Sequence, residues 1–219
     1  MAASLTSPRL SDDLTPLQLD ALADDDVVEE VELRGDLVGA QARGVAIERS
    51  RLVGVRLTAA DLPRLRLVDC VLEGCDLSGA FLEKGDWNRI ALIDCRLSGA
   101  VLSTSTLRHV RWERCRADHV VLRFVKAEQL LIEDCVLSGA DLASASIVGG
   151  RILASDLTSA DLSQAKLRGA HLHGSTLDGV QGGAALAGVV IGSAQVVPVA
   201  LSVFAGLGIR VDDDPDAAG

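Results

Sequence analysis

The sequence repeats with a period of five residues, and this period limits the possible folds more than any other feature. From Leu37 to Leu177, every fifth position is apolar. The 29 positions hold 20 leucines, four isoleucines, two tryptophans and three alanines. An α-helix repeats near 3.6 residues and a β-strand near 2, so neither element alone explains the pattern. A period this regular indicates one short unit stacked many times.

The position two residues before each of these apolar residues is also selective, being mostly small or apolar, as at Val45, Val55 and Ala60. Two inward residues separated by one outward residue form the alternation of a strand. The next two positions lie outward or at a bend, and 11 of the 29 bends carry glycine. Glycine tolerates the backbone angles of a tight corner. Each unit is therefore predicted to form one short flat face and one corner.

Longer repeats indicate how many faces make one coil. The motif CxLSGA occurs at residues 75–80, 95–100 and 135–140, and 20 residues correspond to four units. Charges at the same spacing alternate in sign, as in Asp36, Arg56, Asp76 and Arg96. Stacked coils lie about 4.8 Å apart, where opposite charges attract. The sequence thus predicts a four-sided parallel β-helix of about seven coils.

Three segments carry a resemblance to a known family. SGADLASASI, EGCDLSGAFL and TSADLSQAKLRGAHL resemble the tandem A(D/N)LXX pattern of the pentapeptide-repeat family, and the pattern covers about two-thirds of the chain. The resemblance implies an all-β solenoid, a right-handed quadrilateral β-helix. The sequence departs from the family motif at Trp87, Ala117 and Ala127, so the middle coils are expected to be less regular.

The ends of such a stack need caps, because the terminal coils expose strand edges. Thr15 and Pro16 are typical of a helix start, and Ser193 could cap a second helix over residues 194–205. We therefore predict short helical caps at both ends. The expected organisation is an acidic segment with a helical cap (1–36), the β-helix (37–180), an irregular coil with an apolar helix (181–210) and an acidic disordered tail (211–219).

Four cysteines recur at spacing 20 and suggest a zinc site. A straight column with a rise of about 4.8 Å cannot place four thiols tetrahedrally around one ion, so we interpret them as small buried side chains. The inward phase also contains two tryptophans, and Gly85 leaves room for the first. The predicted structural core includes Cys75, Cys95, Cys115, Cys135, Trp87, Trp112, Leu77 and Leu97.

The chain contains no catalytic, phosphate-binding or zinc-protease motif. The regular outer faces of the predicted solenoid offer no pocket. His171 and His173 project outward without supporting acids. The basic residues between Arg108 and Lys126 are followed by acids one coil later, which favours a charge-balanced surface over a nucleic-acid site. We predict a protein that is not an enzyme, with no cofactor, no metal and no direct nucleic-acid partner.

The expected location is the cytoplasm. The first residues lack a secretory signal, and five cysteines cannot all pair with one another. The uncharged segment 179–209 is long enough to cross a bilayer, but its glycines, Gln195 and Pro198 leave it only modestly apolar. We therefore predict no membrane contact.

An outward row of apolar residues predicts a protein-interaction stripe. Phe81, Val101 and Val121 share a row with Asp61 and Asp141, and Phe124 lies at the adjacent corner. An apolar stripe rimmed by charge is typical of an interaction site. The chain is therefore expected to be a scaffold or dimerisation module, with another protein or a second copy as partner.

The resemblance implies an alternative, since some pentapeptide-repeat proteins mimic DNA and inhibit DNA gyrase. The net charge of −10 fits this reading, but its distribution does not. Residues 1–36 carry ten acids and two bases (−8), residues 37–180 carry 17 acids and 18 bases (+1), and residues 181–219 carry four acids and one base (−3). A DNA mimic should present negative charge along the rod itself, so we favour the scaffold.

Overall fold

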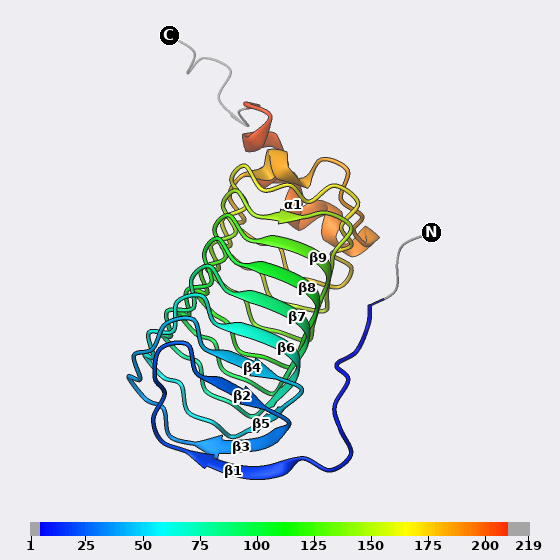
Figure 1. Ribbon diagram of the computed structural model, residues 1–219. Coiled ribbons are helices and arrows are strands. Elements are labelled where there is room, and N and C mark those ends of the chain that lie inside the picture. Colours follow the sequence, from blue (N-terminus) through cyan, green and yellow to red (C-terminus); the bar gives the residue numbers. More distant parts are fainter. Residues whose placement is uncertain (1–4, 210–219) are drawn as a thin grey trace, which may run out of the picture.

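The computed structural model describes residues 5–209, which form a coiled rod (Figure 1). The apolar residues at every fifth position line the inside of this rod. All 29 predicted core positions from Leu37 to Leu177 are buried. Side chains at the inward position two residues earlier complete the core, which forms one continuous column. The predicted phase of the repeat is therefore confirmed.

The described residues contain eleven strands in one parallel sheet, followed by two 3-10 helices and one α-helix. The elements are β1 (Thr15–Leu19), β2 (Val27–Glu29), β3 (Val31–Gly35), β4 (Ala46–Glu48), β5 (Arg51–Val53), β6 (Arg66–Glu73), β7 (Asp86–Ile93), β8 (Thr106–Glu113), β9 (Lys126–Glu133), β10 (Ser146–Ile147), β11 (Arg151–Leu153), η1 (Gly183–Leu186), η2 (Ser193–Gln195) and α1 (Val196–Gly206).

Neighbouring coils pair with an offset of 20 residues. Leu67 on β6 lies opposite Trp87 on β7, which lies opposite Leu107 on β8. Strands β6 to β9 each run across two faces, whereas the other two faces pair through single bridges such as Asp76 to Arg96. This register confirms the predicted four-sided solenoid of about seven coils.

Every corner of the repeat places a residue in the left-handed backbone region. From Gly39 to Gly179, all 29 corner positions have positive φ; 11 are glycines and the other 18 are not. A left-handed conformation costs a non-glycine residue about 1–2 kcal/mol. The backbone N–H groups at these corners donate to the next coil, as that of Ala59 donates to the carbonyl oxygen of Ser78. Pairing between coils therefore imposes a conformation that many of these residues would not adopt alone.

The predicted N-terminal helix is wrong. Thr15–Leu19 forms β1, which pairs with β3 and places Thr15 opposite Val31, an offset of 16. Leu17 and Leu19 are half-buried while Gln18 between them is exposed, which is the alternation of a strand. Pro16 fits because an edge strand has one side free of ladder hydrogen bonds. The solenoid thus begins before residue 37, in coils of 16 and then 19 residues.

The C-terminal end follows the prediction more closely. The five-residue phase slips after Leu177, and His171 pairs with Val190 at an offset of 19. Helix α1 confirms the predicted apolar helix, although Ser193 begins η2 and does not cap α1 directly. The predicted disordered tail, 211–219, lies outside the described residues. Within residues 5–209, none of the helices has the length and apolar character needed to cross a membrane.

Candidate protein-interaction site

The predicted stripe forms a continuous row on one flat face. Single parallel bridges join Asp61 to Phe81, Phe81 to Val101, Val101 to Val121 and Val121 to Asp141. The side chain of Phe81 is 51% exposed, and the two valines are half-buried. The structure therefore brings the three apolar residues together in the predicted order, with a carboxylate at each end of the row.

Phe124 lies at the corner beside this row. Its backbone is left-handed, with φ of 58°, and its side chain is 57% exposed. Arg123, the residue before it, forms an ion pair with Asp141 at the end of the stripe. Hydrogen bonding to Asp141 raises the pKa of the Arg123 side chain. Phe124 thus adds apolar surface next to the stripe, separated from it by a paired charge.

A second apolar surface, on α1, is larger than the sequence pattern predicts. Val199 is the one buried residue that α1 contributes to the core. Close packing at glycines holds the helix against the end of the rod: a Cβ at Gly183 would meet the carbonyl oxygen of Ser202 at 1.9 Å. Large side chains on and just after the helix remain exposed, namely Val196, Val197, Leu201, Phe204, Leu207 and Ile209.

A signal for this surface is present in the sequence. A helix that only caps a rod should have one apolar and one polar side. Residues 196–209 contain no charged residue, so no outer polar side can form. A helix without a polar side is normally buried, so this uncharged surface is a candidate interaction site.

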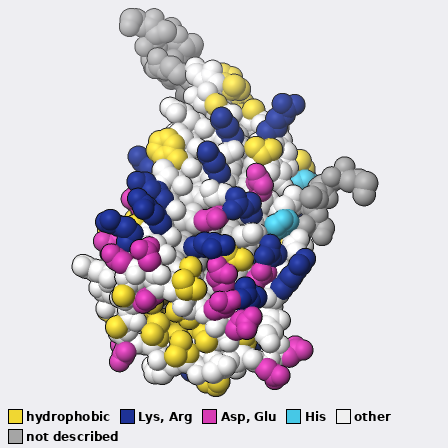
Figure 2. All heavy atoms as spheres, viewed as in Figure 1, with side chains coloured by type: hydrophobic (Ala, Val, Ile, Leu, Met, Phe, Trp, Pro, Cys, Tyr) yellow, Lys and Arg dark blue, Asp and Glu magenta, His cyan; other side chains and the backbone are white. Residues whose placement is uncertain are grey.

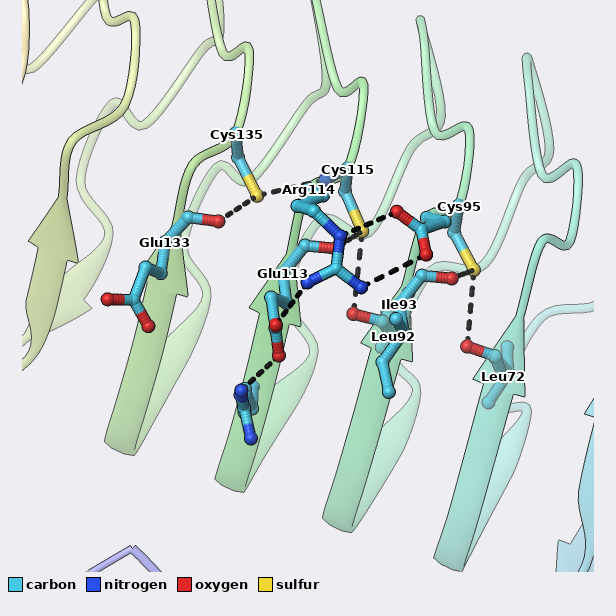
Figure 3. Close-up of polar contacts among 11 residues, drawn as sticks. Leu72, Leu92, Ile93, Cys95, Glu113, Arg114, Cys115, Glu133 and Cys135 are labelled. Atoms are coloured by element: carbon cyan, nitrogen blue, oxygen red, sulfur yellow. Dashed lines mark hydrogen bonds and ion pairs between the residues drawn. The ribbon is translucent and has the colours of Figure 1, made fainter.

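The four cysteines of the predicted core are buried. Figure 3 shows three of them, Cys95, Cys115 and Cys135, in a column along the rod. Sγ of Cys95 lies 3.4 Å from the carbonyl oxygen of Leu72, and Sγ of Cys115 lies 3.5 Å from that of Leu92. Ser105 and Ser175 make the corresponding contact through Oγ. A side-chain donor at this position therefore satisfies a carbonyl of the coil below, a role that the sequence pattern does not predict.

The cysteine thiols are buried side chains of the core. Burial raises the pKa of Cys70, which lies in a neighbouring column, to about 12. A thiol with such a pKa is a poor nucleophile and a poor metal ligand. The pKa of the buried Cys75, by contrast, is lowered by its hydrogen bond with Cys95. Among residues 5–209, no group of three or more histidine, cysteine or acidic side chains is arranged to hold a metal ion. The rings of His171 and His173 stack with centroids 5.7 Å apart on the exposed surface.

Both tryptophans are fully buried, as predicted. A Cβ at Gly85 would lie 3.1 Å from Nε1 of Trp87, so the absence of a side chain at residue 85 makes room for the indole. Trp112 lies opposite Leu92 and Ile132 in the neighbouring coils. The rings fill the core and are not available as a ligand platform.

The basic stretch of the sequence is neutralised by neighbouring acids. Figure 2 shows positive and negative side chains interspersed on one face of the rod. The ion pairs are Arg108 with Asp86, Arg111 with Glu113, Arg114 with Asp94 and Glu113, Arg116 with Asp118, and Arg123 with Asp141. The surface is charge-balanced as predicted, but most partner acids lie in the same coil or the coil before, and only Arg123 pairs with an acid of the following coil.

The sequence matches two family models, both described as pentapeptide repeats, over residues 65–142 and 154–181. No curated protein matches the chain significantly. Among solved structures, HetL of the cyanobacterium Nostoc sp. strain PCC 7120, a pentapeptide-repeat protein involved in heterocyst differentiation regulation, is 21% identical, with a TM-score of 0.40. The similarity covers 76% of this chain and 85% of HetL.

Two further structures show the same kind of similarity. Trypsin-treated QnrB1, a plasmid-mediated fluoroquinolone resistance protein, is 22% identical, with a TM-score of 0.38, over 89% of this chain and 99% of QnrB1. Rfr23 of the cyanobacterium Cyanothece 51142 is 18% identical, with a TM-score of 0.19, over 58% of this chain and 91% of Rfr23. The period of five, the four-sided coil and the two family models lead to one conclusion: the chain belongs to the pentapeptide-repeat family.

Proposed function

We propose that this protein is a non-catalytic scaffold that forms a homodimer through α1 and presents the stripe Phe81–Val101–Val121 to a partner protein. The observation that carries the proposal is the exposed apolar surface of α1. Val197 is 81% exposed and Leu201 is 66% exposed on a helix without a charged residue. A surface of this kind is stable in water only when another molecule covers it.

The sizes of the two surfaces support this division of roles. The stripe offers roughly 150–300 Å² of apolar area, or about 4–8 kcal/mol before the cost of association. That is too little for a tight complex by itself. The six exposed side chains on and after α1 offer roughly 600 Å² per copy, which approaches one side of a standard interface. A two-fold pairing of these helices would bury the same patch on both copies.

The charge distribution supports the scaffold over a DNA mimic. The outward row Asp36, Arg56, Asp76 and Arg96 alternates in sign and continues with Arg116 and Val136, and the row of the stripe contains acids and apolar residues. A gyrase-binding mimic of a duplex needs a dense row of carboxylates on one face. The observed rows lack this property, so gyrase remains the less favoured partner.

A matched pair of variants tests the dimer. Val197→Asp places a charge on the apolar surface of α1, and Val148→Asp places the same charge at a corner of the rod where the valine is 57% exposed. In sedimentation equilibrium, the parent and Val148→Asp should have the mass of a dimer, and Val197→Asp that of a monomer. A parent that is monomeric at all concentrations would refute dimerisation.

Phe81→Asp tests the stripe, because it continues the acidic row begun by Asp61 and replaces an outward side chain. It should leave both the dimer mass and the circular dichroism spectrum unchanged, while abolishing co-purification of partners that the parent retains. Loss of the dimer in this variant would instead place the self-association on the flat face. Inhibition of supercoiling by the parent in a gyrase assay would favour the DNA-mimic alternative.

A further inference from the structure

The N-terminal segment does not coil with the rest of the chain. Residues 5–14, here called the strap, run beside the stacked coils before β1 begins (Figure 1). The backbone N–H of Thr6 donates to Nδ1 of His109, at 3.2 Å. The backbone N–H of Arg9 donates to Oδ1 of Asp69, at 2.9 Å. The strap thus lies across coils that are far from it in sequence.

The spacing of these two contacts shows that the strap is extended. Asp69 and His109 occupy the same corner column, two coils apart, which corresponds to about 9.6 Å. Arg9 lies three positions after Thr6, and three steps of extended chain span about 10 Å. Pro8 fixes its own φ at about −65° and biases Ser7 towards extended backbone. The rise of the coils and the length of the strap therefore match.

The burial pattern of the strap is also that of an extended peptide on a surface. Thr6, Pro8 and Leu10 are half-buried, whereas Ser7 and Arg9 are exposed. The strap forms no strand, so it adds nothing to the ladder that holds the coils together. The strap accordingly lies on the corner column Asp69–Arg89–His109, and this strap-covered surface is here called the groove.

Asp69 in the groove is also held by a residue of the rod. Asp69 is 6% exposed, and its carboxylate accepts hydrogen bonds from Nε and Nη2 of Arg89, at 2.6 and 2.5 Å. Burial by itself would raise the pKa of Asp69, but the hydrogen bonds from Arg89 and from the N–H of Arg9 hold that pKa below its usual value. Arg89, a residue of the rod, thus orients the carboxylate together with the N–H of Arg9 from the strap.

We propose that the groove along Asp69–Arg89–His109 is a docking site for an extended peptide segment of a partner protein, and that the strap is its intramolecular competitor. The partner segment would share the chemistry of the strap: two backbone N–H donors three residues apart, and apolar side chains at alternating positions. This site lies apart from α1 and the stripe, so it does not depend on the dimer or on the flat face.

The proposal can be tested in the full-length chain. The double variant Thr6→Pro/Arg9→Pro removes both N–H donors of the strap and leaves every groove residue unchanged. A fluorescently labelled peptide with the sequence of residues 1–14 is then titrated against each protein and followed by anisotropy. If the strap occupies the groove about 99% of the time, the parent should bind the peptide about 100-fold more weakly than the double variant.

Three controls establish that the peptide binds in the groove and through the two N–H donors. Ser7→Pro changes an exposed strap residue whose N–H makes none of the contacts above, and it should behave like the parent. A peptide with proline at positions 6 and 9 should not bind. His109→Ala in the double variant removes one acceptor and should weaken binding at least about tenfold.

Two results would overturn the proposal. If the double variant retains the circular dichroism spectrum of the parent but does not bind the peptide, the groove is not a peptide site. If the parent and the double variant bind the peptide equally well, the strap does not compete for the groove.

Discussion

At the scale of single residues, the corners show that hydrogen bonding between coils overrides the backbone preference of the individual residue. Eighteen corner residues adopt left-handed backbone without being glycine, although this conformation is easiest for glycine. The hydrogen bonds between coils offset this cost at each level. The corner is therefore the position where single substitutions should most readily improve stability.

Ala59 and Gly79 occupy the same corner column in adjacent coils, with φ of 54° and 64°. Ala59→Gly should raise the free energy of unfolding by about 0.5–1 kcal/mol, because relief of about 1–2 kcal/mol of strain exceeds the added chain entropy. Gly79→Ala should lower it by a similar amount, since a Cβ there meets no atom within 4 Å and only backbone strain acts. Urea unfolding measures both; equal stability of the two variants would contradict the argument.

Alanine variants of Leu97 and Ser98 test which positions of the repeat point inward and which point outward. Leu97 is fully buried, so Leu97→Ala should lower the free energy of unfolding by about 2–5 kcal/mol. Ser98 points outward, but its Oγ donates to Oδ1 of Asp118, at 2.7 Å, which the sequence does not predict. Ser98→Ala should therefore cost about 1 kcal/mol, not nothing. Denaturant titration measures the free energy of unfolding of both variants. Equal losses would show that the assignment of inward and outward positions is wrong.

At the scale of elements, the two ends of the rod differ in how they finish the stack. β1 continues the coil pattern as a strand with one free edge, and α1 lies across the other end. Gln195, just before α1, donates through Nε2 to the carbonyl oxygens of Leu172 and Ser175, at 2.7 and 2.6 Å. The last coil thus receives side-chain hydrogen bonds where no further coil is available.

The ion pair between Asp69 and Arg89 beneath the strap predicts that the stability of the fold depends on pH. The pKa of Asp69 is lowered in the folded protein, so its ion pair with Arg89 stabilises the fold above the ordinary aspartate pKa. This stabilisation should disappear as the pH falls through the lowered pKa. Asp69→Asn should therefore be less stable than the parent near pH 6, and the difference should shrink towards pH 2. A constant difference in urea unfolding across this range would exclude the ion pair as its source.

At the scale of the whole molecule, the acidic charge gathers where a strand edge is open. Ten acids lie in residues 1–36, around β1, β2 and β3, while the rod beyond them is nearly neutral. Exposed strand edges invite pairing with other chains, and charged residues near an edge oppose it. The charge of −8 in residues 1–36 is thus suited to protecting the N-terminal edge, whereas the C-terminal end carries an uncharged helix suited to association.

The sequence by itself determined the period, the four faces and the core, because each five-residue unit meets the same environment in every coil. A leucine at position 97 is buried for the same reason as one at position 77. The apolar stripe could be predicted too, since the register of 20 residues places Phe81, Val101 and Val121 in one row.

Only the tertiary structure decided the features in which the repeat is broken. Thr15 and Pro16 are compatible with both a helix start and an edge strand, and pairing with β3 selects the strand. The contact of Thr6 with His109 joins residues 103 positions apart, for which no local pattern exists. For α1, the sequence indicates that no side of the helix is charged, but only the placement of the helix shows which apolar side chains remain uncovered.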